Sequence, residues 1–320
     1  MSAADRWGRR RARPDFFIVG VARSGTTLAR AILTGHPDVQ VPAETGFLPK
    51  LVRARPSWWG KKGVRSELFV RLAFANGRLA AAGLEPRHLL LALAQRPPTR
   101  PVEAISVIYE LATHNENAEH IGDKTPGYER HVQLLWDAFP HARFIHLVRH
   151  PLDVVASLRH QPWGPSDPLA AGMLWLRSIR ACTSATVPAE SMLLVRLEDL
   201  VSNPVRTVDR MSHHLGVTPH PQMLRFPQRA EAIRQQNLHP AGHDGLSRPL
   251  RTTRAWEQEL SDRDAARAWS LVASAARPLG YDGPEGASKV AESDAVVRLA
   301  RFQTAQSWRR GRTLMRLLHP

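Results

Sequence analysis

The stretch FFIVGVARSGTT, residues 16–27, constrains the fold of this chain more than any other part of the sequence. It begins with four apolar residues that favour β-structure, Phe16 to Val19, as a buried strand in a parallel sheet requires. Gly20 ends this run, and a polar loop then leads into the helical pattern LARAIL. A strand, a glycine-containing loop and a helix N-terminus in this order direct several backbone N–H groups at one point. The stretch therefore predicts an α/β fold with a site for a phosphate group.

The loop differs from the common phosphate loop of nucleoside triphosphatases at one position. Gly20 and Gly25 have the spacing of G-x-x-x-x-G-K-[ST], but Thr26 stands where that motif has its lysine. The cation of this loop comes earlier, at Arg23. Since the lysine that reaches a β- or γ-phosphate is absent from the motif, we expect a function other than ordinary triphosphate hydrolysis. The alternative is a βα turn without a ligand, which the convergence of arginine, serine and two threonines disfavours.

A carboxylate is predicted at the same edge of the sheet as the loop. After a short helix over Thr27–Thr34, the segment DVQVP is interpreted as a second strand, and Glu44 follows it. Ligands of open parallel sheets bind beyond the carboxyl ends of the strands. A carboxylate at that edge can take a proton from an incoming hydroxyl group. The alternative for Glu44 is a glutamate that caps a helix or forms a salt bridge.

Two later strands end in polar residues of the same kind. HIGDKTP is predicted to end in a turn that carries Lys124, which can reach a phosphate or a developing oxyanion. RFIHLVRHP places Arg149 at its end, and Ser157 lies two turns into the helix that follows. Together these two side chains can hold one anionic group from two sides. The alternatives are a solvated lysine and an ion pair between Arg149 and Asp153.

Charge and cysteine content narrow the classes of protein. The chain of 320 residues carries a formal charge of +15, and much of the excess lies in residues 1–14 and 294–320. The remaining positive charge suits a small polyanionic ligand. The single cysteine, Cys182, excludes an intrachain disulfide and a cysteine-based zinc site, which favours a reducing compartment. No apolar run approaches the ~18–20 residues of a membrane-spanning helix. We expect a cytoplasmic protein, with peripheral membrane contact through the basic C-terminal tail as the alternative.

The predicted organisation is a three-layer α/β fold with a P-loop-like nucleotide site. Helices flank a five-stranded, mostly parallel β-sheet. The predicted divisions are a flexible basic arm over 1–14, one domain over 15–285 and a basic tail over 286–320. Within the domain, residues 47–117 are a helical insertion that we expect on the acceptor side. A loop rich in Gly, Pro, His and Arg contains three arginines that either cover an anionic ligand or bind none: Arg248, Arg251 and Arg254.

Taken together and in order, these motifs resemble the sulfotransferase family that uses 3′-phosphoadenosine-5′-phosphosulfate as its donor. The resemblance is closest to the branch of the tyrosylprotein sulfotransferases and their bacterial relatives. The segments that carry it are GVARSGTTLARAILTGHPDVQVPAET, DKTP and FIHLVRHPLDVVAS. Weaker matches in VRLEDLVSNP, RAWEQELS and RPLGYD extend it over about residues 15–282.

The resemblance implies a role for each matching residue. The loop would hold the 5′-phosphosulfate, through Arg23, Ser24, Gly25, Thr26 and Thr27. Arg149 and Ser157 would hold the 3′-phosphate. Glu44 falls at the position of the general base, and Lys124 falls at that of a lysine near the sulfuryl group. The implied acceptor carries a hydroxyl group on a carbohydrate, lipid, metabolite or peptide, and neither a metal ion nor specific nucleic acid is implied.

The sequence departs from the family pattern in two respects. Leu197 replaces an aromatic residue that often ends the last strand, which puts one nucleotide contact in doubt. Other sulfotransferases use a histidine as base, so three histidines remain alternatives: His114, His120 and His146.

Two rival functions remain at this point. A kinase-like P-loop phosphotransferase acting on a small molecule would need an acid to hold Mg²⁺, and Asp123 is the candidate. A binding module would instead grip nucleic acid with its basic ends, and its affinity would fall steeply with salt.

Overall fold

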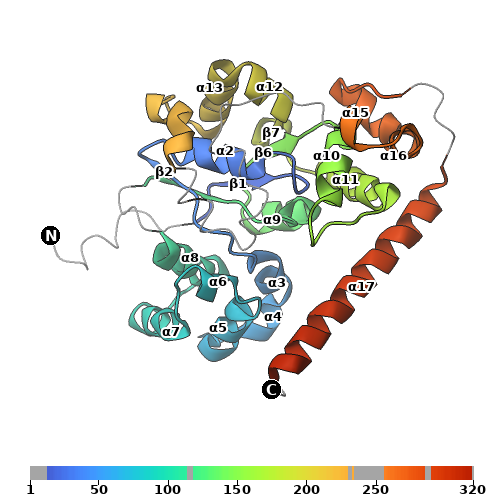
Figure 1. Cartoon of the computed structure of the whole chain (residues 1–320). Coiled ribbons are helices and arrows are strands. Elements are labelled where there is room, and N and C mark those ends of the chain that lie inside the picture. Colours follow the sequence, from blue (N-terminus) through green and yellow to red (C-terminus); the bar gives the residue numbers. More distant parts are fainter. Residues whose placement is uncertain (1–12, 114–117, 230–232, 234–255, 285–289, 319–320) are drawn as a thin grey trace. The chain divides into compact units, whose positions relative to one another are not determined.

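The structure is a computed structural model that describes residues 13–113, 118–229, 233, 256–284 and 290–318 (Figure 1). The described residues group into two compact units. The sheet unit combines the chain up to Gly20 with Gly25–Leu147 and with the segment that begins at Ala185 and ends at Arg251. The helical unit combines Val21–Ser24, Val148–Ser184 and the chain from Thr252 onward.

The sheet unit is built on a five-stranded sheet with the order β2-β5-β1-β6-β7. Strand β1 pairs in parallel with β5 on one side and with β6 on the other, and β2 pairs in parallel with β5. The expected α/β fold with a five-stranded, mostly parallel sheet is therefore confirmed. The strands span β1 (Phe16–Val19), β2 (Val39–Gln40), β5 (His120–Asp123), β6 (Arg143–Val148) and β7 (Met192–Arg196).

Alternation along β1 fills both faces of the sheet. Phe16 and Ile18 belong to a buried cluster that also contains residues of α2 (Thr26–Leu33) and α13 (Pro204–Leu215). Leu200 of α12 (Leu197–Ser202) completes this layer. Phe17 points the other way, where its ring stacks on Phe144 at a centroid distance of 5.4 Å. Because successive side chains of a strand face opposite sides, four apolar residues in a row specify a strand covered on both faces.

The described residues of the insertion between β2 and β5 form six helices, and Figure 1 shows these helices as one group. Pro86 and Pro101 start two of them, as expected from a residue with a fixed φ angle and no N–H group. Two separate helices, α5 and α6, cover most of residues 66–81, because Gly77 between them has φ +72° and interrupts the helical backbone. The six helices span α3 (Leu48–Arg53), α4 (Arg55–Trp58), α5 (Ser66–Phe74), α6 (Arg78–Ala81), α7 (Pro86–Gln95) and α8 (Pro101–Ala112). A short antiparallel pair, β3 (Trp59–Gly60) and β4 (Gly63–Val64), connects α4 with α5.

The helical unit packs around α11, whose neighbours are α10, α16 and α17. The side chain of Asp167 caps α11 by accepting hydrogen bonds from the backbone N–H groups of Leu169 and Ala170. It also pairs with Arg298 of α17 at 2.7 Å. The helices span α10 (Pro151–Arg159), α11 (Pro168–Thr183), α15 (Trp256–Glu259), α16 (Asp262–Ala276) and α17 (Glu292–Leu318). In the described part of the chain, no helix has the length and apolar character needed to cross a membrane.

Candidate functional site

The loop after β1 has a backbone that few residues other than glycine adopt. Gly20 has φ +148°, and a Cβ atom added there would lie 2.3 Å from the carbonyl oxygen of Leu147 in β6. Arg23 has φ +76° and is the only residue other than glycine with a positive φ among those the structure describes. Non-glycine residues held in this region of φ/ψ space cluster at ligand sites. The loop thus combines a glycine that nothing larger can replace with a strained arginine.

Replacing Gly20 with alanine is therefore expected to destabilise the protein by about 2 kcal/mol or more, from backbone strain and a clash with a main-chain oxygen. Gly83→Ala is the matched control, because Gly83 also has a positive φ of +84° but has no atom within 4 Å of the added Cβ. Urea unfolding of both variants measures the difference. Equal losses of unfolding free energy would show that the close approach of Leu147 has no energetic cost.

Leu197, the residue in place of the family's aromatic one, packs against the loop. A Cβ atom at Gly25 would lie 2.7 Å from Cδ1 of Leu197, and Gly25 has φ +91°. Gly25 directly precedes α2, so Leu197 covers the point at which that helix begins. The departure from the family pattern therefore places an aliphatic side chain, instead of a ring, over the loop glycine.

Three predicted donor-binding residues meet in the helical unit. Nε of Arg23 donates a hydrogen bond to Oγ of Ser157 at 2.9 Å. Nη1 of Arg149 donates to the carbonyl oxygen of Arg23 at 3.4 Å. Burial, and then the charge of Arg149, lower the pKa of Arg23. Two guanidinium groups this close repel each other, and an anion between them would remove that cost. Arg149 also lies 3.8 Å from the carboxylate of Asp153, so the ion pair considered as its alternative does form.

Ser24 has an unsatisfied hydroxyl group. Its side chain is fully buried, and its Oγ makes no hydrogen bond to any residue that the structure describes. Buried hydroxyl groups normally have a partner, because an unmade hydrogen bond costs about 1–3 kcal/mol. An orphaned hydroxyl inside a phosphate-binding loop fits a loop that binds an anion.

Two of the three weaker motif matches, RAWEQELS and RPLGYD, meet beside the residue that follows Arg149. The ring of the next residue, His150, stacks on Trp256 and Trp269 at interplanar angles of 5° and 9°. Its Nε2 donates to the carbonyl oxygen of Asp282 at 2.7 Å, and Tyr281 meets the ring edge-on. Trp256 belongs to RAWEQELS, and Tyr281 and Asp282 belong to RPLGYD. These motifs therefore hold the backbone that follows Arg149.

The sheet unit brings together the predicted base, lysine and helix N-terminus. Nζ of Lys124 donates to Oε1 of Glu44 at 2.5 Å and to Oγ1 of Thr27 at 3.3 Å. Thr27 lies in the first turn of α2, directly after Thr26 and the loop. A second cation, Arg78 of α6, holds the other carboxylate oxygen of Glu44 at 2.6 Å. Nothing in the local sequence around Arg78 predicts this contact.

For each of the two buried partners, burial and the charge of the other partner shift the pKa in opposite directions. Burial raises the pKa of Glu44, but the charges and hydrogen bonds of Lys124 and Arg78 outweigh burial, so the net pKa is lowered. Burial lowers the pKa of Lys124, and Glu44 opposes that shift. Glu44 is therefore ionised at neutral pH, as a proton acceptor must be. The salt-bridged alternative for Glu44 is present, and it leaves the carboxylate in its basic form.

A hydroxyl network fixes the backbone beside Glu44. The carboxylate of Asp123 is 1% exposed and accepts hydrogen bonds from three hydroxyl groups. The donors are Tyr109 at 2.6 Å, Thr45 at 2.7 Å and Thr125 at 2.9 Å. Oγ1 of Thr125 in turn accepts from the N–H group of Thr45 at 3.2 Å. The network joins the chain after β2 to the end of β5. Its hydrogen bonds engage the carboxylate of Asp123, the residue that a kinase-like function would need to bind Mg²⁺.

We expect Tyr109→Phe to lower the free energy of unfolding by about 1.5–3 kcal/mol, since it removes a donor to a buried carboxylate. Ser106→Ala on the same helix is the matched control, because the Ser106 hydroxyl donates to the carbonyl of Val102 one turn earlier. It should cost less than about 1 kcal/mol. Both losses follow from urea unfolding curves, and a Tyr109→Phe loss no larger than that of the control would contradict the network's role.

The histidine alternatives differ in position. His146 is 2% exposed within β6, and burial lowers its pKa to about 4. His120 begins β5, at the opposite end of the strand from Lys124. His114 and the three arginines of the Gly-, Pro- and Arg-rich loop, Arg248, Arg251 and Arg254, lie outside the described residues. Among the described residues, no cluster of three or more His, Cys, Asp or Glu side chains could hold a metal ion.

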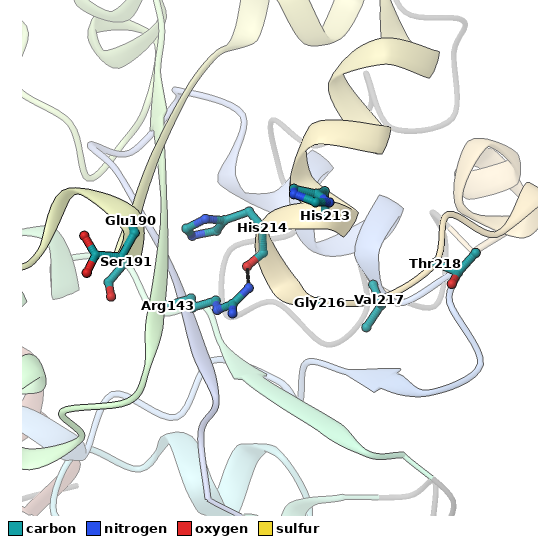
Figure 2. Close-up of a pocket in the computed structure, with 8 residues that line it drawn as sticks. All are labelled: Arg143, Glu190, Ser191, His213, His214, Gly216, Val217 and Thr218. Atoms are coloured by element: carbon teal, nitrogen blue, oxygen red, sulfur yellow. Dashed lines mark hydrogen bonds between the residues drawn. The ribbon is translucent and has the colours of Figure 1, made fainter.

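A separate open pocket of about 590 Å³ lies elsewhere in the sheet unit (Figure 2). Arg143 donates to the backbone carbonyl of His214 at its rim, and Nε2 of His214 donates to the carbonyl of Phe144. None of the site residues predicted from the sequence lines it. Its lining consists of Arg143, Glu190, Ser191, His213, His214, Gly216, Val217 and Thr218.

Comparison with known proteins assigns the class. The model of the sulfotransferase family matches residues 14–222, and the chain belongs to that family. Protein-tyrosine sulfotransferase 1 of Danio rerio is 25% identical over 301 residues, which cover 89% of this chain and 77% of the relative. Protein-tyrosine sulfotransferase of Drosophila melanogaster is 32% identical over 306 residues, covering 90% and 56%.

A solved structure confirms the fold independently. The sulfotransferase domain of the olefin synthase from Synechococcus PCC 7002 superposes with a TM-score of 0.51 at 23% identity. The match covers 87% of this chain and 98% of that domain. The family model and the curated relatives show that the chain is a sulfotransferase enzyme, and they confirm the resemblance carried by its motifs at the level of the family.

Proposed function

We propose that this enzyme transfers a sulfuryl group from 3′-phosphoadenosine-5′-phosphosulfate to an acceptor hydroxyl, with Glu44 as the general base. One observation carries the proposal. Lys124 bridges the carboxylate of Glu44, at 2.5 Å, and the hydroxyl of Thr27 in the helix that follows the phosphate loop. A base and a cation are thereby joined to the helix N-terminus that would receive the donor.

The donor would be held by the residues that the resemblance implies. The loop from Arg23 to Thr27 would bind the 5′-phosphosulfate, and Arg149 with Ser157 would bind the 3′-phosphate. Three observations support this assignment: the buried hydroxyl of Ser24, which has no hydrogen-bond partner among the described residues, the repulsion between the charges of Arg23 and Arg149, and the glycine backbone at Gly25. When bound, the donor supplies the sulfuryl group and a bisphosphate leaving group.

The chain's own side chains would carry out the remaining chemistry. Glu44 takes the proton of the acceptor hydroxyl as the new O–S bond forms and the bond from sulfur to the bridging phosphate oxygen breaks, in line with the attack. Lys124 and Arg23 stabilise the negative charge that develops on that bridging oxygen. Atoms and charge balance without a metal ion, so none is part of the proposal.

The acceptor is proposed to be a hydroxyl-bearing molecule, either a carbohydrate, a lipid, a metabolite or a peptide, that contacts the helical insertion. The relatives are protein-tyrosine sulfotransferases by name, which favours a phenolic hydroxyl as the first one to test. We further propose a cytoplasmic location, with the basic C-terminal tail as the segment that could contact a membrane.

The decisive experiment incubates the purified enzyme with sulfur-labelled donor and a panel of peptide, carbohydrate, lipid and small phenolic acceptors. Mass spectrometry should detect an added sulfate on one class and stoichiometric release of the bisphosphate product. Mg²⁺-dependent turnover of ATP, with no sulfate transferred to any acceptor, would contradict the proposal in favour of phosphoryl transfer.

A further inference from the structure

We infer that Arg78 is a positioning residue for catalysis, which fixes the orientation and the ionised state of Glu44 from the helical insertion. The inference rests on the proposed role of Glu44 as general base. Arg78 belongs to none of the matched motifs and lies 34 residues beyond the glutamate. Its contact with Glu44 is one of the shortest ion pairs that the described residues form.

The two oxygens of Glu44 are divided between two cations. Oε1 accepts from Nζ of Lys124 at 2.5 Å, and Oε2 accepts from Nη1 of Arg78 at 2.6 Å. The lysine side chain is 1% exposed, the glutamate 10% and the arginine 23%. An ionised carboxylate oxygen has more than one acceptor site, so Oε2 can still take a proton while Arg78 holds it. Arg78 is therefore the partner on the more accessible side of the base.

A structured turn presents Arg78 to Glu44. Nδ2 of Asn76 donates to the carbonyl oxygen of Thr45, the residue after the base, at 3.3 Å. Oδ1 of Asn76 accepts from the N–H group of Arg78 at 2.9 Å, and Gly77 between them has φ +72°. The turn is thus tied to the backbone next to Glu44, so Arg78 is not a freely rotating surface side chain.

Gly46 supplies the space that this turn occupies. It has φ +64°, and a Cβ atom added there would lie 2.6 Å from Cδ of Arg78 and 2.8 Å from Nδ2 of Asn76. A Cβ atom at this position would force the side chains of Arg78 and Asn76 to shift. The sequence Glu44-Thr45-Gly46 therefore contains the base and, two residues later, a glycine whose missing side chain leaves room for Arg78.

Arg78 is also the most exposed of the charged side chains around Glu44, so it can be replaced with the least damage to the core. Those charges come from Lys124 at the end of β5, Arg30 in α2, Arg78 in α6, and the neighbouring carboxylate of Asp123. Arg30 is 2% exposed, donates through Nε to the carbonyl of Val41 at 3.1 Å, and interacts electrostatically with both Glu44 and Asp123. Removing Arg78 leaves burial, which raises the pKa of Glu44, opposed by fewer cations. The base should then become protonated at a higher pH.

The first test is the pH dependence of kcat/KM in Arg78→Met. At the acidic end of the profile kcat/KM should fall about tenfold relative to the unmodified enzyme, the effect of one neighbouring charge. At the alkaline end, where Glu44 is ionised in both proteins, the loss should be less than about threefold. Arg78→Lys, which keeps a cation, should recover most of the acid-side activity. Gly46→Ala should resemble Arg78→Met, because it displaces the same side chain.

The matched control is Arg87→Met. Arg87 also lies in the helical insertion and pairs at 2.6 Å with its own carboxylate, Glu85, but its side chain is 72% exposed. Replacing this arginine should leave the pH dependence of kcat/KM unchanged. A uniform fall of kcat/KM at all pH values in Arg78→Met would mean that the arginine serves only folding, and that result would overturn the inference.

The second test does not depend on activity. The pKa of Glu44 is lowered in the folded protein, so its ion pairs contribute stability above its unfolded pKa, and that stability is lost as the pH falls through the folded value. A double-mutant cycle of Arg78→Met and Glu44→Gln, read by thermal unfolding, should show coupling at pH 8 that disappears at acidic pH. Absence of coupling at pH 8 would show that Arg78 and Glu44 do not stabilise each other in the folded protein, and it would overturn the inference.

The tests separate this inference from the proposed function. If Glu44→Gln turns over as fast as the unmodified enzyme, the base assignment fails and the inference fails with it. If Glu44→Gln is inactive but the acidic limb of Arg78→Met is unmoved, the base assignment stands and the inference alone is wrong. If kcat/KM falls on the acidic side in Arg78→Met and recovers in Arg78→Lys, the base assignment and the inference on Arg78 are both supported.

Discussion

Glu44→Gln is expected to lower kcat by a factor of about 10²–10⁴, the usual contribution of a general base. The amide has nearly the same shape as the carboxylate but cannot take the proton of the acceptor hydroxyl. Oε1 of the glutamine can still accept the hydrogen bond from Lys124 that Glu44 accepts at 2.5 Å, so the lysine keeps its partner, whereas the amide NH₂ group cannot accept from Arg78. The affinity for the bisphosphate product, measured by calorimetry, should therefore remain within about threefold.

Glu103→Gln is the matched control for this change. Glu103 is another buried glutamate of the sheet unit, 7% exposed, and its Oε2 accepts from the N–H group of Thr99 at 2.8 Å. Its replacement removes a buried carboxylate without touching the predicted site, so kcat should change by less than about threefold. A Glu44→Gln enzyme that retained its kcat would remove Glu44 from the mechanism and return attention to the histidines.

Arg149→Ala is expected to raise the Kd of the bisphosphate product about 10- to 100-fold. A hydrogen bond between charged groups contributes about 1.5–3 kcal/mol, and the 3′-phosphate would lose its main cation. The change also leaves the nearby carboxylate of Asp153, 3.8 Å from the guanidinium in the present structure, to face the phosphate alone. The indole N–H of Trp175 donates to the backbone carbonyl of Arg149 and should keep the local backbone in place.

Calorimetric titration of the bisphosphate into Arg149→Ala and into Arg159→Ala makes the comparison direct. Arg159 ends α10, the helix that follows Arg149, and pairs with Asp264 at 3.2 Å, so its replacement removes an arginine of equal charge from a structural ion pair. The Kd of the Arg159→Ala variant should be unchanged. Equal affinity of both variants would show that Arg149 does not bind the 3′-phosphate.

The sequence predicts the first strand, the loop and the helix after it because each has a local cause. Four apolar residues define β1, and the spacing of Gly20 and Gly25 defines the loop. The second strand is also predicted, but it pairs over Val39–Gln40 alone, less than the segment DVQVP. Its short length does not matter for the site, because parallel pairing with β5 still brings Glu44 beside Lys124.

Arg78 could not be predicted, because its role depends on three-dimensional contacts that leave no local pattern. It reaches Glu44 only through the positive φ angles of Gly46 and Gly77 and the hydrogen bonds of Asn76. Single glycines occur in loops of every kind, so neither glycine points to this contact. Helix α11 also lacks a local pattern that would predict it. Its first turns are buried on nearly every side, from Pro168 to Met173, so they show no amphipathic period.

The position of the insertion has a consequence for how enzymes of this kind could be re-engineered. Strands β2 and β5 are neighbours, yet Glu44 and Lys124 are 80 residues apart, and the helical layer lies between them in the chain. With the acceptor placed on this layer as proposed, a chimera that received the layer from a relative would change both the acceptor surface and the partner of Oε2 of Glu44 at once. The acceptor preference and the pH dependence of activity would then change together.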